Sequence, residues 1–247
     1  MQVLAIKTPR VEFNDNIDSV LDILSPLNEK TIVAITSKII SFCEGRYVSK
    51  KDISKRQLIE QEADEICDLH RDDDPFSMCL TIKNNLLIPS AGIDESNAND
   101  SYILYPKNVW DSAAYIWNYL KEKNQISDLG IIITDSHTTM MRSGVTGIAL
   151  SWCGFKPVYS YVNKPDLYGR PLQFTQVNIV DALAVSAVFA MGEGNEQTPI
   201  AILTNVPHIK FTESIPTLQD IESINISKDE DLYGPLLNAV KWTRGNN

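Results

Sequence analysis

Apolar residues in this chain occur in short continuous runs that alternate with segments in which they recur every three to four positions. Two runs are strongly apolar, 30–36 (KTIVAIT) and 130–134 (GIIIT). Runs of this length between polar residues are typical of strands that are buried on both faces of a sheet. We therefore predict two central strands. Weaker runs predict further strands at 46–48, 86–88, 102–104 and 199–203.

The segments between these runs show helical spacing of their apolar residues. Ser37 and Asp111 stand in the position of N-caps, and Gly45 is expected to end the first helix with left-handed backbone. The acidic segment 72–75 (DDDP) is typical of a turn. The predicted helices are 37–42, 54–70, 112–123 and 177–191.

Length and composition indicate one folded unit. The chain has 247 residues, of which 43% are hydrophobic and 22% charged, as in globular proteins. No segment repeats at a fixed period, and no low-complexity linker divides the chain. Since strands and helices are mixed along it, we predict a single domain over residues 1–247, of the α+β class with a mixed sheet.

The charge balance and the lengths of the apolar runs exclude several classes of function. With 22 basic and 32 acidic side chains the net charge is −10, so the chain lacks the basic surface that nucleic-acid binding requires. Its most apolar stretch, Ala182 to Met191, is about half as long as a membrane span of roughly 20 residues. The N-terminal run Val3 to Ile6 is shorter than a signal-peptide core. We therefore expect a cytoplasmic protein without nucleic-acid or membrane partners.

The familiar motifs of several large enzyme classes are absent. The chain contains no GxxxxGK[ST], no GxGxxG after a strand, no HExxH and no GxSxG. These absences exclude the common P-loop kinases, nicotinamide dehydrogenases, zinc peptidases and serine hydrolases. The chemistry must therefore be sought in other groups of polar residues.

Four short polar stretches follow the ends of predicted elements, where open α/β architectures bind ligands. In the first, Ser37 and Lys38 open a helix, so that an anion could lie between the lysine and the helix N–H groups. The lysine could equally extend into solvent. In the second, Asp94 and Asn97 could hold a cation and a nucleotide, or serve as ordinary turn residues.

The third and fourth stretches supply further acids. Asp135 and Ser136 follow the strand at 130–134 and present oxygen ligands of the kind that Mg²⁺ and Mn²⁺ take, although such an acid can also cap a strand end. The neighbouring His137 is a weaker candidate for a general base. Glu193 lies between two glycines after an apolar helix, a position that is also an ordinary helix end.

Taken in this order and spacing, the four stretches resemble the CofE-type enzymes, ligases that add L-glutamate to the deazaflavin coenzyme F420-0. The resemblance extends over most of the chain. Each matching piece is short and common, whereas the ordered set is specific. The matching segments are Thr36–Ser41, Glu44–Arg46, Ala91–Asp94, Ser96, Asn97, Asp111–Ala113, Ile133–His137, Arg142–Ala149, Asp166–Arg170, Thr175, Met191–Glu193 and Pro199.

The resemblance implies two bound divalent metal ions, Mg²⁺ or Mn²⁺. One ion would be held by Asp94 and Asp135, and the other by Ser136 and Glu193. It also implies a reaction in which a carboxylate becomes an acyl phosphate and the amino group of glutamate then attacks it. Such a reaction needs no covalent enzyme nucleophile.

The resemblance further implies that GTP is the co-substrate and contacts Ser37, Lys38 and Asn97. It also implies an intertwined homodimer. Aromatic residues are enriched at protein interfaces, and we expect four of them to be exposed for this purpose rather than to fill the core. These aromatic residues are Trp110, Tyr115, Trp117 and Tyr159.

Two departures from the family pattern bear on the substrates. The family usually has a Gly-Arg-Pro segment where this chain has Thr138–Met141 (TTMM). If that arginine helps to hold the acidic acceptor, Thr139 cannot replace its planar, bidentate guanidinium. Phe42 stands where many members have a second lysine near the nucleotide, which predicts altered GTP affinity or base preference.

The resulting hypothesis is a GTP- and metal-dependent ligase that joins L-glutamate to F420-0. Two alternatives remain. The same scaffold could act on a related acidic acceptor other than F420-0, as the altered segment Thr138–Met141 suggests. The chain could instead be a noncatalytic nucleotide- or flavin-binding protein, because fold and function can separate. The presence of all four metal-ligand candidates favours an enzyme.

Overall fold

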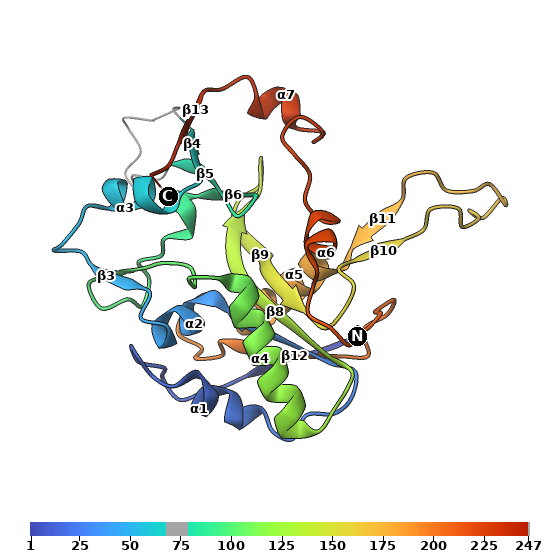
Figure 1. Cartoon of the computed structure of the whole chain (residues 1–247), viewed down its shortest axis with the longest axis horizontal. Helices are drawn as coiled ribbons and strands as arrows, with labels where there is room; N and C mark the ends of the chain where they lie inside the picture. The colour runs from blue at the N-terminus through green and yellow to red at the C-terminus, as the bar shows by residue number, and fades with distance from the viewer. Residues whose placement is uncertain (68–78, 247) are drawn as a thin grey trace.

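The computed structural model describes residues 1–67 and 79–246. Its centre is a five-stranded mixed sheet of order β1-β12-β2-β8-β9, in which β2 and β8 run parallel and the other neighbours are antiparallel. Figure 1 shows this sheet crossing the middle of the molecule. Its strands are β1 (Gln2–Ile6), β2 (Thr31–Thr36), β8 (Leu129–Thr138), β9 (Val145–Cys153) and β12 (Ile200–Thr204).

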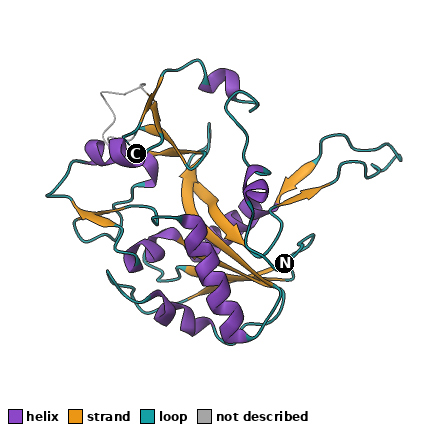
Figure 2. Ribbon diagram, viewed as in Figure 1, coloured by secondary structure: helices purple, strands orange, loops and turns teal. Residues whose placement is uncertain are grey.

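Three smaller sheets and a set of helices surround the central sheet (Figure 2). The smaller sheets have the orders β13-β4-β5-β6, β3-β7 and β10-β11. Their strands are β3 (Tyr47–Ser49), β4 (Glu65–Cys67), β5 (Leu80–Lys83), β6 (Leu86–Pro89), β7 (Ser101–Ile103), β10 (Val158–Ser160), β11 (Gln176–Asn178) and β13 (Trp242–Arg244). The helices are α1 (Ile17–Leu21), α2 (Ser37–Cys43), α3 (Lys55–Glu62), α4 (Val109–Asn124), α5 (Ile179–Met191), α6 (Leu218–Glu222) and α7 (Gly234–Leu237), with 3-10 turns η1 (Asp22–Leu24) and η2 (Ser90–Gly92).

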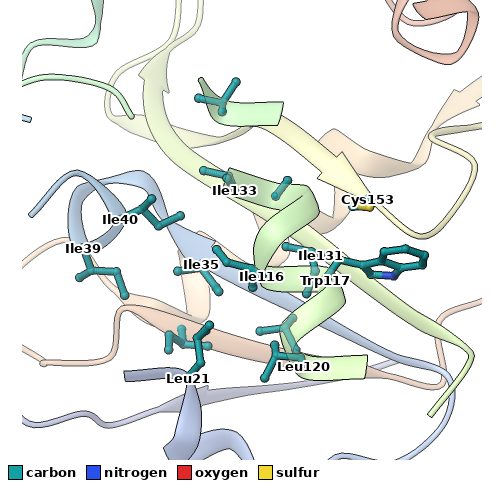
Figure 3. Close-up of a cluster of buried hydrophobic side chains, with 14 of the residues drawn as sticks. Leu21, Ile35, Ile39, Ile40, Ile116, Trp117, Leu120, Ile131, Ile133 and Cys153 are labelled. Atoms are coloured by element: carbon teal, nitrogen blue, oxygen red, sulfur yellow. The ribbon is translucent and has the colours of Figure 1, made fainter. Parts of the chain in front are cut away.

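The alternation of side chains along β8 explains why helices cover both faces of the central sheet. Ile131 and Ile133 belong to the core cluster that includes Ile116 of α4, whereas Ile132 belongs to a second cluster with Leu183 of α5. Figure 3 shows the first cluster packed between the sheet and α4. Strand β8 is therefore apolar at every position in its first half, as its sequence predicts.

The mixed sheet and its helices agree with the predicted α+β class, and each predicted strand is present within one or two residues at its start. Strand β8 continues to Thr138, beyond the predicted end at residue 134, because its polar second half pairs with β9. Gly45 has the expected left-handed backbone, with φ of +68°. No helix in the described part of the chain combines the length and apolarity of a membrane span.

The helix predicted at 54–70 is wrong in its second half. Helix α3 ends at Glu62, because Ala63 has extended backbone and the following residues form β4. Ile66 is buried by pairing with β5 and β13, so its apolar character reflects a strand and not a helix face. Residues 68–70 and the turn predicted at 72–75 lie outside the described residues.

The predicted N-caps are also displaced. Thr36 precedes α2 in the cap position, and α4 is capped by the side chain of Asn108, which accepts hydrogen bonds from the N–H groups of Trp110 and Asp111. Asp111 lies inside the first turn, where its charge complements the helix dipole. Similarly, α5 begins at Ile179 and not at residue 177, because the preceding residues form β11.

The expectation that four aromatic residues are exposed is wrong for Trp117. This side chain is 4% exposed, and its indole N–H donates to the Leu129 carbonyl at 2.8 Å. Trp110 is half-buried against the Trp152 ring, and Tyr159 is also half-buried. Only Tyr115 among the four is largely exposed. Spacing along α4 places Trp117 on the face that packs on the sheet.

Candidate active site

A cavity of about 780 Å³ opens where β2 and β8 end side by side. Most of the rest of its wall comes from α2 and from three other segments, namely 8–11, 88–99 and 191–199. Ser37, in the first turn of α2, is 4% exposed and does not line the cavity. The predicted site residues that do line it are Lys38, Asp94, Asn97, Asp135, Ser136 and Glu193.

The loop that carries Asp94 has an unusual backbone. Ser90, Ala91 and Gly92 all have positive φ, at 52°, 55° and 72°. Non-glycine residues adopt this conformation at a cost in free energy, and such residues concentrate at functional sites. The Thr81 hydroxyl supports the turn, because it accepts from the Ala91 N–H at 2.8 Å and donates to the Ile88 carbonyl at 2.6 Å.

Asp94 forms an ion pair with Lys38, which extends from α2 across the cavity. Its carboxylate also accepts hydrogen bonds from the N–H groups of Glu95 and Ser96, at 2.6 and 2.7 Å. Burial raises the pKa of Asp94, but the charge and hydrogen bond of Lys38 outweigh it and hold that pKa below its usual value. Asp94 is therefore ionised at neutral pH.

Asp135 lies deeper in the cavity and is less well compensated. Burial raises the pKa of its carboxyl to about 6, even though the Tyr105 hydroxyl and the Ser136 N–H donate hydrogen bonds to it. The Tyr105 hydroxyl is 2.5 Å from Asp135 Oδ2. The negative charge of Asp94 raises the pKa further, whereas Lys38 lowers it.

Glu193 brings a third acid to the same cavity, from the loop that follows α5. Burial raises its pKa, and the charges of Asp94 and Glu196 add to this effect, whereas a hydrogen bond from Ser136 and the charge of Lys38 oppose it. Lys38 thus influences all three acids, Asp94, Asp135 and Glu193. The site has more negative charge than this one lysine can neutralise.

The chain was also compared with known proteins. The family model described as F420-0:Gamma-glutamyl ligase matches residues 5–205, which include all the cavity residues named above. This chain belongs to the F420-0:gamma-glutamyl ligase family. The predicted resemblance is confirmed at the level of the family.

Several curated relatives support this membership. A coenzyme F420:L-glutamate ligase of Methanococcus maripaludis is 30% identical over an alignment that covers 94% of this chain and 97% of the relative. The enzyme of that name from Methanocaldococcus jannaschii is 30% identical over 84% of this chain and 89% of its own length. That from Methanosarcina mazei is 29% identical over 82% and 84%, respectively.

The donor set of this F420-0:gamma-glutamyl ligase family member fits divalent metal ions of the magnesium type. Its candidate ligands are carboxylate and hydroxyl oxygens, which Mg²⁺ and Mn²⁺ prefer. In the described part of the chain no three His, Cys, Asp or Glu side chains form a group that could hold one ion. The predicted arrangement requires only two side chains per ion, and Mg²⁺ usually completes its shell with water and substrate phosphate.

Tyr105 is a site residue that the sequence did not reveal. It lies between β7 and α4 in an apolar segment, where a buried tyrosine is usually part of the core. Nothing in its local sequence indicates that its hydroxyl reaches Asp135, which is 30 positions away. A polar group inside an otherwise apolar run is a weak signal at best.

The segment that departs from the family pattern forms the tip of the β8–β9 hairpin. Thr138 and Val145 line the cavity, whereas Met140 and Met141 are exposed beyond it. Phe42, the other departure, also lines the cavity. Both departures therefore concern the surface that a substrate would meet.

Proposed function

We propose that this chain is a GTP- and divalent-metal-dependent ligase that forms an amide between L-glutamate and a carboxylate of F420-0. Family membership supports the ligase chemistry, and the similarity to coenzyme F420:L-glutamate ligases supports the acceptor. The observation that carries the proposal is the meeting of Asp94, Asp135 and Glu193, from three distant segments, in one cavity beside Lys38. Carboxylates so arranged repel one another unless cations are bound.

The candidate site residues divide into two groups by the ligand that they would hold. Lys38 and Asn97 would contact GTP, the lysine as a point charge toward phosphate. Ser37 remains assigned to GTP by resemblance, although its side chain is buried. Lys38 now neutralises Asp94, and phosphate would compete with that carboxylate for the ammonium group.

The metal ions would be held by four side chains that share the cavity. Asp94 and Asp135 would ligate one Mg²⁺ or Mn²⁺, and Ser136 and Glu193 the second. When bound, the two ions would neutralise the charge that develops on a transferring phosphoryl group. This stabilises the transition state by several kcal/mol.

The proposed reaction has two balanced steps. A carboxylate oxygen of the acceptor attacks the γ-phosphorus of GTP, so that an acyl phosphate forms and GDP leaves. The amino group of L-glutamate then attacks the acyl carbon, loses a proton and expels phosphate. The cavity residues bind and orient the reactants, and no side chain has to become covalently attached. Burial raises the pKa of the Cys43 and Cys153 thiols to about 11 and 12, which makes them poor nucleophiles.

A second candidate function keeps the reaction and changes the acceptor. The hairpin tip Thr138–Met141 has no cation at the place of the family's usual arginine, although it borders the cavity. An acceptor that carries fewer phosphate groups than F420-0 would need that cation less. A noncatalytic nucleotide- or flavin-binding role is the third candidate, and retention of the acids argues against it.

One incubation separates these candidates. The protein is mixed with GTP, Mn²⁺ or Mg²⁺, L-glutamate and F420-0, and the products are examined by mass spectrometry. Addition of one or more glutamyl units supports the first candidate. Release of GDP without an adduct supports a different acceptor. If neither GDP nor an adduct forms, the result supports the noncatalytic role.

We also propose that the chain is a cytoplasmic homodimer. The arm formed by β10 and β11 projects from the rest of the molecule (Figure 1), and three of its large apolar side chains, Leu167, Tyr168 and Phe174, are at least 89% exposed. Exposed apolar surface of this kind is typical of a protein interface. Light scattering at micromolar concentration should give twice the chain mass, and a monomeric mass would contradict the dimer.

A further inference from the structure

The side chain of Tyr105 reaches the cavity from the core. It is 3% exposed and belongs to the cluster between the central sheet and α4. Its hydroxyl nevertheless donates to Asp135 Oδ2 at 2.5 Å, from the segment that joins β7 to α4. Its backbone is also held, because Arg46 Nε donates to the Tyr105 carbonyl at 3.0 Å. Both ends of this residue are therefore fixed.

The ring of Tyr105 occupies space that Gly92 leaves open. A Cβ atom placed on Gly92 would lie 2.1 Å from Tyr105 Cζ and 2.4 Å from its hydroxyl oxygen, far inside contact distance. Gly92 has φ of +72° and lies two residues before Asp94. The loop that presents Asp94 thus also makes room for the tyrosine that contacts Asp135.

We propose that Tyr105 is a positioning residue whose hydroxyl orients the Asp135 carboxylate for divalent-cation binding, with Gly92 providing the space for its ring. The inference rests on the proposed function, in which Asp135 is a metal ligand. Groups that hydrogen-bond to a metal ligand fix its orientation, and their loss typically weakens metal binding about 10- to 100-fold. A ring that only filled the core would have no such effect when its hydroxyl is removed.

The test measures Mn²⁺ binding without turnover, from the electron paramagnetic resonance signal of free Mn²⁺. Tyr105→Phe keeps the ring and removes the hydroxyl, so we expect Mn²⁺ affinity to fall about 10- to 100-fold. In the ligase assay the Mn²⁺ concentration for half-maximal rate should rise by a similar factor, with a much smaller change in kcat at saturating Mn²⁺.

Tyr102→Phe is the matched control. Tyr102 is a buried tyrosine three residues earlier whose ring lies beneath the Lys50 ammonium group, and it does not line the cavity. Removal of its hydroxyl should leave Mn²⁺ affinity unchanged. Equal weakening by Tyr102→Phe and Tyr105→Phe would indicate a general packing effect and would overturn the inference.

A pair of substitutions tests the role of Gly92. Gly92→Ala should displace the tyrosine ring and weaken Mn²⁺ binding at least as much as Tyr105→Phe. Tyr105→Leu lacks the two ring carbons and the hydroxyl oxygen that the new Cβ would meet, so Gly92→Ala should cost much less affinity in its presence. Additive losses in the double variant would show that the two residues act independently, against the inference.

Asp135→Asn separates failure of the inference from failure of the proposed function. If Asp135→Asn loses Mn²⁺ affinity and Tyr105→Phe does not, the metal assignment stands and the inference is wrong. If Asp135→Asn binds Mn²⁺ as the unaltered protein does, the metal assignment fails and the inference fails with it.

Discussion

Glu62 and Asp135 are both half-buried carboxyl groups, and their surroundings move their pKa values in opposite directions. Glu62 lies at the end of α3 between two cations. Lys83 Nζ is 2.6 Å from Glu62 Oε2, and Arg46 Nη2 donates to both carboxylate oxygens at 2.9 and 3.0 Å. Asp135 has the hydroxyl of Tyr105 and a backbone N–H instead.

The pKa values follow from this difference in partners. Burial raises the pKa of Glu62, but the hydrogen bonds and charges of Lys83 and Arg46 outweigh it, so the pKa lies below its usual value. At Asp135 the neutral donors do not overcome burial, and the pKa rises to about 6. Burial thus acts in the same direction on both groups, but two adjacent cations reverse its effect at Glu62, whereas the negative charge of Asp94 adds to it at Asp135.

The comparison distinguishes a structural cluster from a functional one. In the cluster of Glu62, Arg46 and Lys83 one carboxylate is paired with two cations, and the cluster links α3 and β5 to the residue before β3. The cavity cluster of Asp94, Asp135 and Glu193 has three acids around the single lysine Lys38, so that a bound cation would lower their mutual repulsion. Acids with raised pKa values that share a cavity are what a site for divalent cations presents before its ions bind.

The largest effect is expected from removal of the Asp135 charge. Asp135→Asn keeps the size of the side chain and removes the charge of a proposed metal ligand, so metal-dependent GTP turnover should fall by about 10²- to 10³-fold or more. The circular dichroism spectrum should remain unchanged. Turnover at the unaltered rate, with the same thermal shift on addition of Mn²⁺, would contradict the metal assignment.

The corresponding change at Glu62 should affect stability instead. Glu62→Gln leaves the buried Lys83 and the half-buried Arg46 without this counter-charge, which should lower the free energy of unfolding by about 2 to 4 kcal/mol. Urea unfolding at pH 7 measures this change. The folded variant should retain most of its Mn²⁺ affinity. Loss of that affinity with unchanged stability would contradict the structural role of Glu62.

Added metal should stabilise the cavity cluster. Mn²⁺ at about 100 times its dissociation constant should add about 2.7 kcal/mol to the free energy of unfolding, if it binds only the folded chain. Thermal unfolding should therefore shift upward with Mn²⁺ for the unaltered protein and for Glu62→Gln, but much less for Asp135→Asn. An equal shift in all three proteins would indicate binding elsewhere.

The smallest effect concerns pH in the absence of metal. Because burial raises the folded-state pKa of Asp135 to about 6, above its ordinary value of 3.8, its carboxyl supports folding at low pH and loses that contribution as the pH rises through 6. Asp135→Asn, which cannot ionise, should thus be about 1 to 3 kcal/mol more stable than the unaltered protein at pH 7. The two should converge near pH 4, and parallel urea-unfolding curves across this range would contradict the raised pKa.

Local pattern by itself determined the central strands and most of the cavity's acids. Apolar runs such as 130–134 predict buried strands, because a strand whose two faces both pack against helices needs apolar side chains at consecutive positions. Strand β8 is such a strand. Asp94, Asp135 and Glu193 were found because each follows an apolar element in a short polar stretch. Their order along the chain was enough to indicate the family.

Only the tertiary structure decided which charged and hydrogen-bonding partners lie beside the acidic side chains. The end of α3 at Glu62 and the contact of Tyr105 with Asp135 both depend on partners far away in the sequence. The opposite pKa shifts of Glu62 and Asp135 have the same origin, because folding brings Lys83 and Arg46 beside Glu62 but buries Asp135 close to the negative charge of Asp94. Hydrophobic periodicity records which faces are buried, whereas the pairing of polar groups across the core is settled by packing of the whole chain.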